Sequence, residues 1–168
     1  MKKYILCVFI ATLIFNVANA QGKHYSNEKA NKKFTGIWEA KFNGKIVKLT
    51  LESINRRYIK AFDSYIDVVE GNFVVLDASS KVLYGATNSP IILTGIVDGN
   101  DPNLLNSTYE DSRQSLVAEA RLKYNPSKQV LLLTINNTNK GSIKFKTKDK
   151  VEPKKEFRIP MQLTLTKK

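Results

Sequence analysis

Cysteine and histidine are nearly absent from this sequence. Its 168 residues include one cysteine, Cys7, and one histidine, His24. A lone cysteine cannot form an intramolecular disulfide, and zinc and copper sites draw most of their ligands from cysteine and histidine. A Ser-His-Asp triad would have to use His24. This residue lies in a polar segment that we expect to be flexible, so it is not positioned to act as a general base. We therefore expect no disulfide, no metal and no cofactor, and a stability that comes from an apolar core.

Long apolar runs are also scarce. The one clear run covers residues 4–15, follows two lysines and precedes Ala18-Asn19-Ala20. These are the three parts of a secretory signal peptide, whereas a membrane-spanning helix needs about 20 apolar residues. We predict that residues 1–20 are a signal peptide cleaved after Ala20, and that the mature chain is periplasmic or secreted without a stable membrane span. Cys7 lies inside the run rather than at the cleavage point, so we expect no lipid anchor.

Acidic residues are in short supply and unevenly distributed. The chain has 27 Lys and Arg against 15 Asp and Glu, a formal net charge of +12. Residues 21–61 hold ten basic and three acidic residues, residues 62–119 hold two and nine, and residues 140–168 hold ten and three. Residues 144–150 have four lysines at alternating positions and one aromatic residue, a pattern typical of a solvent-facing strand rather than of single-stranded nucleic-acid binding. We expect no nucleic-acid partner, and an anionic polysaccharide or an acidic protein is the alternative partner of the basic strands.

Regular patterning begins after a polar N-terminal stretch. Residues 21–33 are expected to form a flexible leader, which leaves residues 34–168 as one domain. Apolar and polar residues alternate over 36–43 and again over 45–53, on either side of Asn43-Gly44. Because both turn positions need positive φ, which Asn and Gly tolerate, this pattern predicts a β-hairpin.

Short strand-like segments recur along the rest of the chain, separated by polar turns. No segment has a convincing helical stripe, and closely spaced strands argue for an antiparallel sandwich or barrel. We predict an all-β fold, a single antiparallel, lipocalin-like β-barrel of about 8–10 strands, with an open β-sandwich as the alternative. The further strands are expected over residues 57–63, 65–69, 73–76, 81–84, 91–97, 116–122, 130–135, 142–148 and 157–166. Gly71-Asn72 is expected to form the turn between residues 65–69 and 73–76.

Two motifs carry resemblances to known proteins. Phe34-Thr35-Gly36-Ile37-Trp38 resembles the Gly-x-Trp opening of lipocalin-like barrels, where the tryptophan packs across the barrel floor. Together with Tyr65-Ile66-Asp67-Val68-Val69-Glu70-Gly71-Asn72-Phe73, it resembles a family of small secreted Bacteroidetes proteins known as a domain of unknown function. The resemblance covers residues 34–97, departs from the family at Asn72-Phe73, and brings no catalytic residue with it. Its motif residues are Phe34, Gly36, Trp38, Tyr65, Asp67 and Gly71.

The absence of catalytic side chains favours a binding role. The first hypothesis is an exported, non-enzymatic binding protein that holds a small apolar ligand at the barrel mouth. The second is a cell-envelope interaction protein whose basic strands contact an anionic surface. Under the first hypothesis, the residues that would line or floor the cavity are Trp38, Phe42, Leu49 and Phe73.

Carboxylates support a third hypothesis, a hydrolase built on Asp63, Asp67 and Glu70. Asp67 has apolar neighbours that could raise its pKa by desolvation, but an aspartate in such a pattern more often caps a turn or faces solvent. The segment 98–101 resembles part of a calcium loop. It lacks the glutamate spacing of such a loop and is more typical of an ordinary turn.

Overall fold

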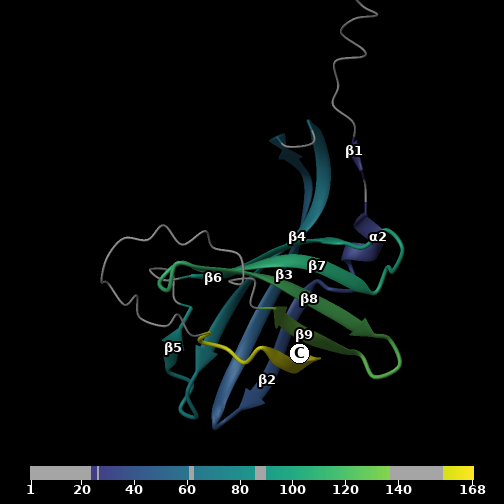
Figure 1. Ribbon diagram of the computed structural model, residues 1–168. Coiled ribbons are helices and arrows are strands. Elements are labelled where there is room, and N and C mark those ends of the chain that lie inside the picture. The colour runs from purple at the N-terminus through teal and green to yellow at the C-terminus, as the bar shows by residue number, and fades with distance from the viewer. Residues whose placement is uncertain (1–23, 26, 61–62, 86–89, 137–156) are drawn as a thin grey trace, which may run out of the picture.

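Figure 1 shows a computed structural model of the protein, which describes residues 24–25, 27–60, 63–85, 90–136 and 157–168. Over these ranges it contains one short helix and ten strands: β1 (His24–Tyr25), α2 (Glu28–Asn31), β2 (Gly36–Phe42), β3 (Lys45–Ile59), β4 (Ser64–Leu76), β5 (Val82–Tyr84), β6 (Ile91–Val97), β7 (Leu104–Asp111), β8 (Leu116–Asn125), β9 (Val130–Asn136) and β10 (Gln162–Lys167). No helix in the described ranges is long and apolar enough to cross a membrane.

Eight of the strands close into an antiparallel barrel. β2, β3, β4, β6, β7, β8, β9 and β10 follow one another around it, and β10 returns to pair with β2. This closing pair is short, with Thr166 opposite Glu39 and Lys167 opposite Trp38. The prediction of a single antiparallel β-barrel is confirmed, and the alternative of an open sandwich is wrong.

A two-stranded arm projects from the barrel. β3 and β4 are the longest strands, and residues 53–59 of β3 pair with residues 64–69 of β4 beyond the last pairing of β3 with β2. A β-bulge between Ile54 and Arg57, with Arg56 at φ 58°, lets β3 change direction without ending. We call residues 53–59 and 64–68 the arm. It rises above the barrel in Figure 1.

The connections gather at two ends of the barrel. α2, the arm, the β6–β7 loop (residues 98–103) and the β8–β9 turn (residues 126–129) lie at one end, which we call the α2 end. The β2–β3 turn, β5 and the β7–β8 turn lie at the opposite end, which we call the far end.

Several predicted boundaries are confirmed and others are wrong. Asn43 and Gly44 form the predicted hairpin turn with φ of 47° and 72°. The predicted turn at Gly71 is wrong, because β4 runs through it and a Cβ there would lie 2.4 Å from Cδ2 of Leu51. β7 was not predicted, because its exposed positions are all polar. The predicted strand 142–148 and its lysines lie outside the described residues.

The polar leader has regular structure in its described part. β1 pairs in parallel with β4, and α2 follows it before the chain enters β2. Asn31 of α2 is fully buried and its amide Nδ2 donates to Oγ of Ser53 at 3.2 Å. The leader is therefore docked on the base of the arm along these residues.

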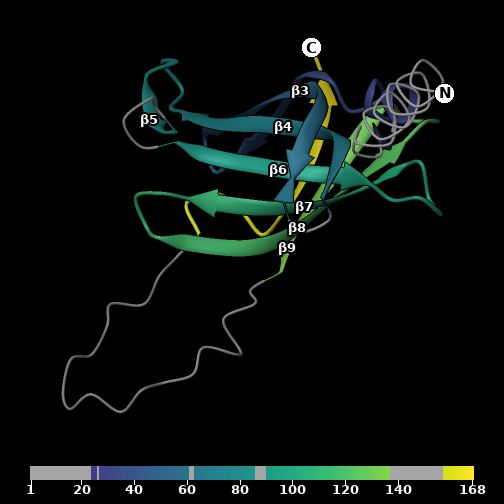
Figure 2. The same ribbon diagram turned by 90° about the horizontal axis from the view of Figure 1, so that it is seen from above.

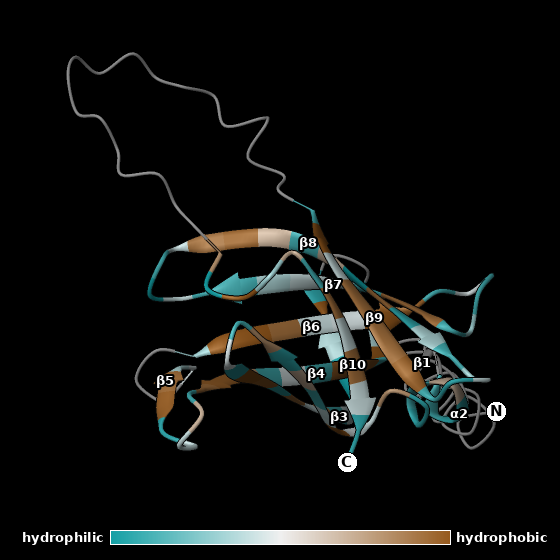
Figure 3. Ribbon diagram, turned by 90° about the horizontal axis from the view of Figure 1, so that it is seen from below, coloured by the Kyte–Doolittle hydropathy of each residue, from teal (hydrophilic) through white to brown (hydrophobic). Residues whose placement is uncertain are grey.

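The barrel interior is filled by apolar side chains. Inward and outward positions alternate along the strands, as in β8, where every second residue from Leu116 to Leu122 is buried. In Figure 3 the strands carry most of the hydrophobic residues and the turns between them are largely hydrophilic. The largest fully buried side chains are Trp38, Tyr109, Phe34, Phe73, Leu49, Leu51, Ile91, Leu93, Leu105, Leu116, Leu122 and Leu131.

A buried ion pair ties β7 to the segment before β10 at the far end. Nε of Arg158 donates to Oδ2 of Asp111 at 2.6 Å, and Nη2 of Arg158 donates to Oδ1. The two side chains are 7% and 0% exposed. Tyr84 packs over the guanidinium, with 5.4 Å between the Arg158 Cζ atom and the ring centre. Next to the pair, burial raises the pKa of Tyr109.

Candidate functional site

The four residues predicted to line a cavity do not share one environment. Trp38, Leu49 and Phe73 are 0% exposed, so no water-sized space adjoins them. Phe42 is 41% exposed at the end of β2, on the rim of the far end. The structure therefore brings three of the four into the packed core and leaves the fourth at the barrel mouth. A binding site must therefore lie on the outside of the barrel.

The Gly-x-Trp motif closes the barrel floor at the α2 end. The indole Nε1 of Trp38 donates to the carbonyl of Phe34 at 2.7 Å. The ring of Tyr124 meets Trp38 edge-on at 6.3 Å, and Nζ of Lys167 lies 5.2 Å from the indole centre. Gly36 has φ 119°, and a Cβ there would lie 3.0 Å from Cε of Lys167. These contacts are structural and leave no room for a ligand at Trp38.

The second motif holds the arm in place. Asp67 is 1% exposed; its Oδ2 accepts the backbone N–H of Asn27 at 3.1 Å, and its Oδ1 accepts that of Arg56 at 3.0 Å. One carboxylate thus fixes both the leader and the bulge of β3. Tyr65 lies 5.4 Å from the ring of Tyr58, with the Arg56 guanidinium 5.2 Å above its centre.

The three carboxylates of the hydrolase hypothesis lie in different surroundings. Asp63 is exposed and accepts a hydrogen bond from the Tyr58 hydroxyl at 2.7 Å, which raises the pKa of Tyr58. Glu70 forms an ion pair with Arg57 on the outer face of the barrel. Asp67 and Glu70 are three positions apart on one strand, so they face opposite sides at a separation of about 10 Å. This arrangement does not bring a pair of carboxylates to one scissile bond.

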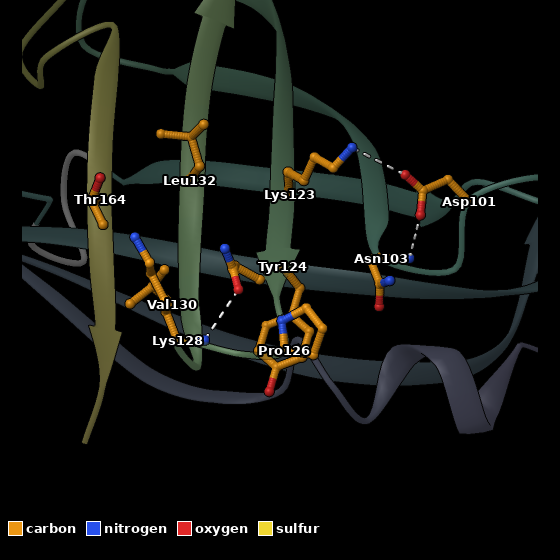
Figure 4. A pocket seen from close by; sticks show the side chains of 10 residues that line it. Asp101, Asn103, Lys123, Tyr124, Pro126, Lys128, Val130, Leu132 and Thr164 are labelled. Carbon is orange, nitrogen blue, oxygen red and sulfur yellow. Dashed lines mark hydrogen bonds and ion pairs between the residues drawn. The ribbon is translucent and has the colours of Figure 1, made fainter.

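An open groove lies on the outer surface at the α2 end. It has a volume of about 520 Å³, and Figure 4 shows its lining. The pairing register places Lys123, Leu132 and Thr164 in one row across β8, β9 and β10, on the outer face. Leu132 is 46% exposed at the centre of this row. The full lining is Asp101, Asn103, Lys123, Tyr124, Asn125, Pro126, Lys128, Val130, Leu132 and Thr164.

The β6–β7 loop forms one wall of this groove and is held by its own aspartates. Oδ1 of Asp98 accepts the backbone N–H groups of Asn100 at 2.8 Å and Asp101 at 3.2 Å, which lowers the pKa of Asp98. Oδ2 of Asp101 lies 3.4 Å from Nζ of Lys123. The loop is therefore an ordinary turn cluster, and no group of three or more potential metal ligands occurs in the described part of the chain.

Two lysines stand at opposite sides of the groove. Lys123 lies on β8 and forms a weak, solvent-exposed ion pair with Asp101. Lys128 lies in the β8–β9 turn, where its backbone N–H donates to Oδ1 of Asn125 at 3.1 Å. Its side chain is exposed and has no ion-pair partner among the described residues. A partly apolar floor thus lies between two cations.

This groove was not predicted from the sequence, although one signal for it is present. Leu131, Leu132 and Leu133 are consecutive in β9, and alternate residues of a barrel strand face opposite sides. At least one leucine of such a run must therefore face outward, which marks an apolar spot on the surface; in β9 it is the middle one, Leu132. The loop residues that complete the groove are distant in sequence and carry no comparable signal.

Known proteins give no further guidance on this site. Comparison of the chain with protein-family models, with curated proteins and with solved structures found no match. The resemblance to a secreted Bacteroidetes family therefore stays a prediction.

Proposed function

We propose that this protein is an exported, non-enzymatic binding protein that holds a negatively charged ligand with an apolar face in the groove at the α2 end. The observation that carries the proposal is the exposed Leu132 between Lys123 and Lys128. Exposed leucines on a barrel wall are normally scattered, but this one lies in a concavity lined by Tyr124 and Val130. The volume of the groove is within the range of about 300–1,000 Å³ found for small-molecule sites.

The chemistry of the lining favours an anionic amphiphile. An apolar ring or chain would cover Leu132 and Val130, and its negative group would pair with the lysine amines at the rim. The amides of Asn103 and Asn125 add hydrogen-bond capacity beside them. The packed interior supports the outer location, because binding beside Leu49 or Phe73 would require repacking the core.

The fluorescent probe 8-anilinonaphthalene-1-sulfonate, an aromatic sulfonate, tests this proposal. We expect saturable binding that the double variant Leu132→Ser, Lys128→Gln weakens by about tenfold or more. The matched control is Val117→Ser with Lys41→Gln. Val117 is an apolar residue near the far end of β8 that is 55% exposed, against 46% for Leu132, and Lys41 is an exposed lysine outside the groove. Unchanged affinity in the groove variant would refute the proposed site.

Salt dependence provides a second test. If the two lysines contribute, affinity for the probe should fall as NaCl rises from about 50 to 500 mM, because exposed charges are screened at these concentrations. Binding that is insensitive to salt would contradict the role of the lysines, even if Leu132 proved necessary.

An anionic polysaccharide is the second candidate ligand, favoured by a neighbouring groove. It has a volume of about 550 Å³ and lies between α2 and the β6–β7 loop, with Lys29 and Lys33 in its lining. Lys33 reaches across to the carbonyl of Pro102 at 3.2 Å and to Oδ1 of Asn103 at 3.0 Å, so it joins this groove to the first. Polygalacturonate should then bind in a salt-sensitive manner, and Lys29→Gln with Lys128→Gln should weaken it. No difference between this variant and Lys41→Gln would reject the polysaccharide.

A further inference from the structure

A second concavity separates the arm from the outer wall of the barrel. It has a volume of about 560 Å³. Ile59 and Val68 of the arm form one side, and the outer faces of β6, β7 and β8 form the other. Figure 2 shows the arm crossing in front of β6 and β7 when the molecule is seen from above. We call this concavity the arm cleft; it is separate from the groove of the proposed function.

The side chains on the barrel wall of the arm cleft lie in two rows across the strands. The pairing register aligns Thr94, Thr108 and Glu119 in one row. It aligns Ile96, Asn106 and Arg121 in the next row, one step nearer the α2 end. All six are outward-facing positions, and all six line the cleft.

Four of these side chains have unused hydrogen-bonding capacity. Asn106 is engaged, since its Nδ2 donates to Oδ2 of Asp98 at 2.9 Å. By contrast, the described part of the chain offers no hydrogen bond or ion pair to the side chains of Thr94, Thr108, Glu119 and Arg121. A carboxylate only accepts, a guanidinium only donates, and a threonine hydroxyl does both. The cleft therefore presents donors and acceptors side by side along about 10 Å of wall, taking adjacent strands to be about 4.8 Å apart.

The shape of the wall depends on Gly95. A Cβ at this position would lie 2.6 Å from the carbonyl oxygen of Asn106 and 2.6 Å from Cβ of Ser107. Any larger residue would push β6 away from β7 and disturb the alignment of the two rows. The close approach of these strands is thus a requirement of the cleft.

We propose that the arm cleft binds a neutral, hydroxyl-rich ligand, namely a short stretch of an uncharged polysaccharide. Each sugar hydroxyl both donates and accepts, so it can satisfy Glu119 and Arg121 together. The C–H faces of the sugar rings would pack on Ile96 and Ile59. A negatively charged ligand would be repelled by Glu119, and a positively charged one by Arg121. A purely apolar ligand would leave both side chains without hydrogen-bond partners.

The test uses four soluble hexasaccharides: cellohexaose, xylohexaose, mannohexaose and maltohexaose. Each is titrated into the ¹⁵N-labelled protein, and backbone amide shifts are followed. We expect at least one of them to shift the amides of residues 94–96, 106–108 and 119–121 and to leave those of residues 126–132 unmoved. Glu119→Ala with Arg121→Ala should weaken that binding by about tenfold or more, since each loses a hydrogen bond to a charged group.

Matched variants separate recognition from folding. Thr108→Val keeps the shape of the side chain and removes one hydroxyl, so it should weaken binding without altering the rest of the spectrum. Thr50→Val on β3 and Arg113→Ala in the β7–β8 turn lie outside the cleft and should have no effect. Sulfonate binding in the other groove should also be unchanged in the cleft variants, so the two proposals fail independently. If no hexasaccharide shifts the cleft amides, or if the cleft variants bind as tightly as the parent protein, the proposal is wrong.

Discussion

The buried ion pair between Asp111 and Arg158 gives the sharpest stability prediction. Asp111→Asn keeps the shape of the side chain but removes the negative charge that faces the buried Arg158 guanidinium. The two charge-assisted hydrogen bonds at this site each contribute about 1.5–3 kcal/mol. Removing one partner of a buried pair typically costs about 3–5 kcal/mol, because the remaining charge stays desolvated. We expect Asp111→Asn to lower the free energy of unfolding by an amount in this range.

Urea unfolding followed by tryptophan fluorescence measures this loss. Trp38 is the only tryptophan and is fully buried, so its emission reports on the barrel as a whole. Arg158→Met removes the other charge and should cost a similar amount. The double variant should cost less than the sum of the two single variants, with a coupling of about 2–3 kcal/mol, because it leaves no unpaired charge.

Two results would refute this reasoning. Single variants that each lose less than about 1 kcal/mol would mean that the pair is better solvated than its burial suggests. Strictly additive losses would mean that each side chain acts through its own packing, without energetic coupling between the two charges.

Three further predictions follow from individual contacts. Gly71→Ala should destabilise the protein by about 1–3 kcal/mol, because its Cβ would overlap a leucine methyl group of β3; Gly99→Ala, with nothing within 4 Å, is the matched control and should change stability by less than about 0.5 kcal/mol in urea unfolding. Asp67→Ala should speed hydrogen exchange of the Arg56 amide, which loses its acceptor, and unchanged exchange would show that the bulge is held by other contacts. The lowered pKa of Asp98 means that the folded protein binds this proton less tightly than the unfolded chain, so its contribution is present near neutral pH and is lost as pH falls through the folded-state pKa. Asp98→Ala should therefore unfold at lower urea than the parent at pH 7 and match it at about pH 2.

Local sequence patterns predicted those parts of the fold that depend on residues close together in the chain. Asn43-Gly44 predicted its hairpin because positive φ at two successive residues is a requirement of the turn itself. Short strand-like runs bounded by polar turns likewise predicted the strands of residues 91–97, 116–122 and 130–135.

The errors arose where distant residues decide the outcome. Gly71 was interpreted as a turn, but it lies mid-strand because the leucines of β3 leave no space for a side chain there. β7 went unpredicted because its polar residues resemble a loop until β6 and β8 pair with both of its edges. The groove and the arm cleft were beyond sequence analysis for the same reason, since each combines strands and loops that meet only in the folded chain.

The short pairing of β10 with β2 has a consequence for how the barrel folds. Every other contact between barrel strands joins neighbours in the order of the chain, so a curved open sheet can grow by local steps. The β10–β2 pairing instead joins positions 127 residues apart, as in the hydrogen bond from Thr166 to the carbonyl of Glu39. To form this pairing, the chain must close its longest loop, which costs conformational entropy, and it gains only the shortest strand pairing of the barrel. Closure should then be the late and rate-limiting event of folding, and this seam the place where the native barrel first opens.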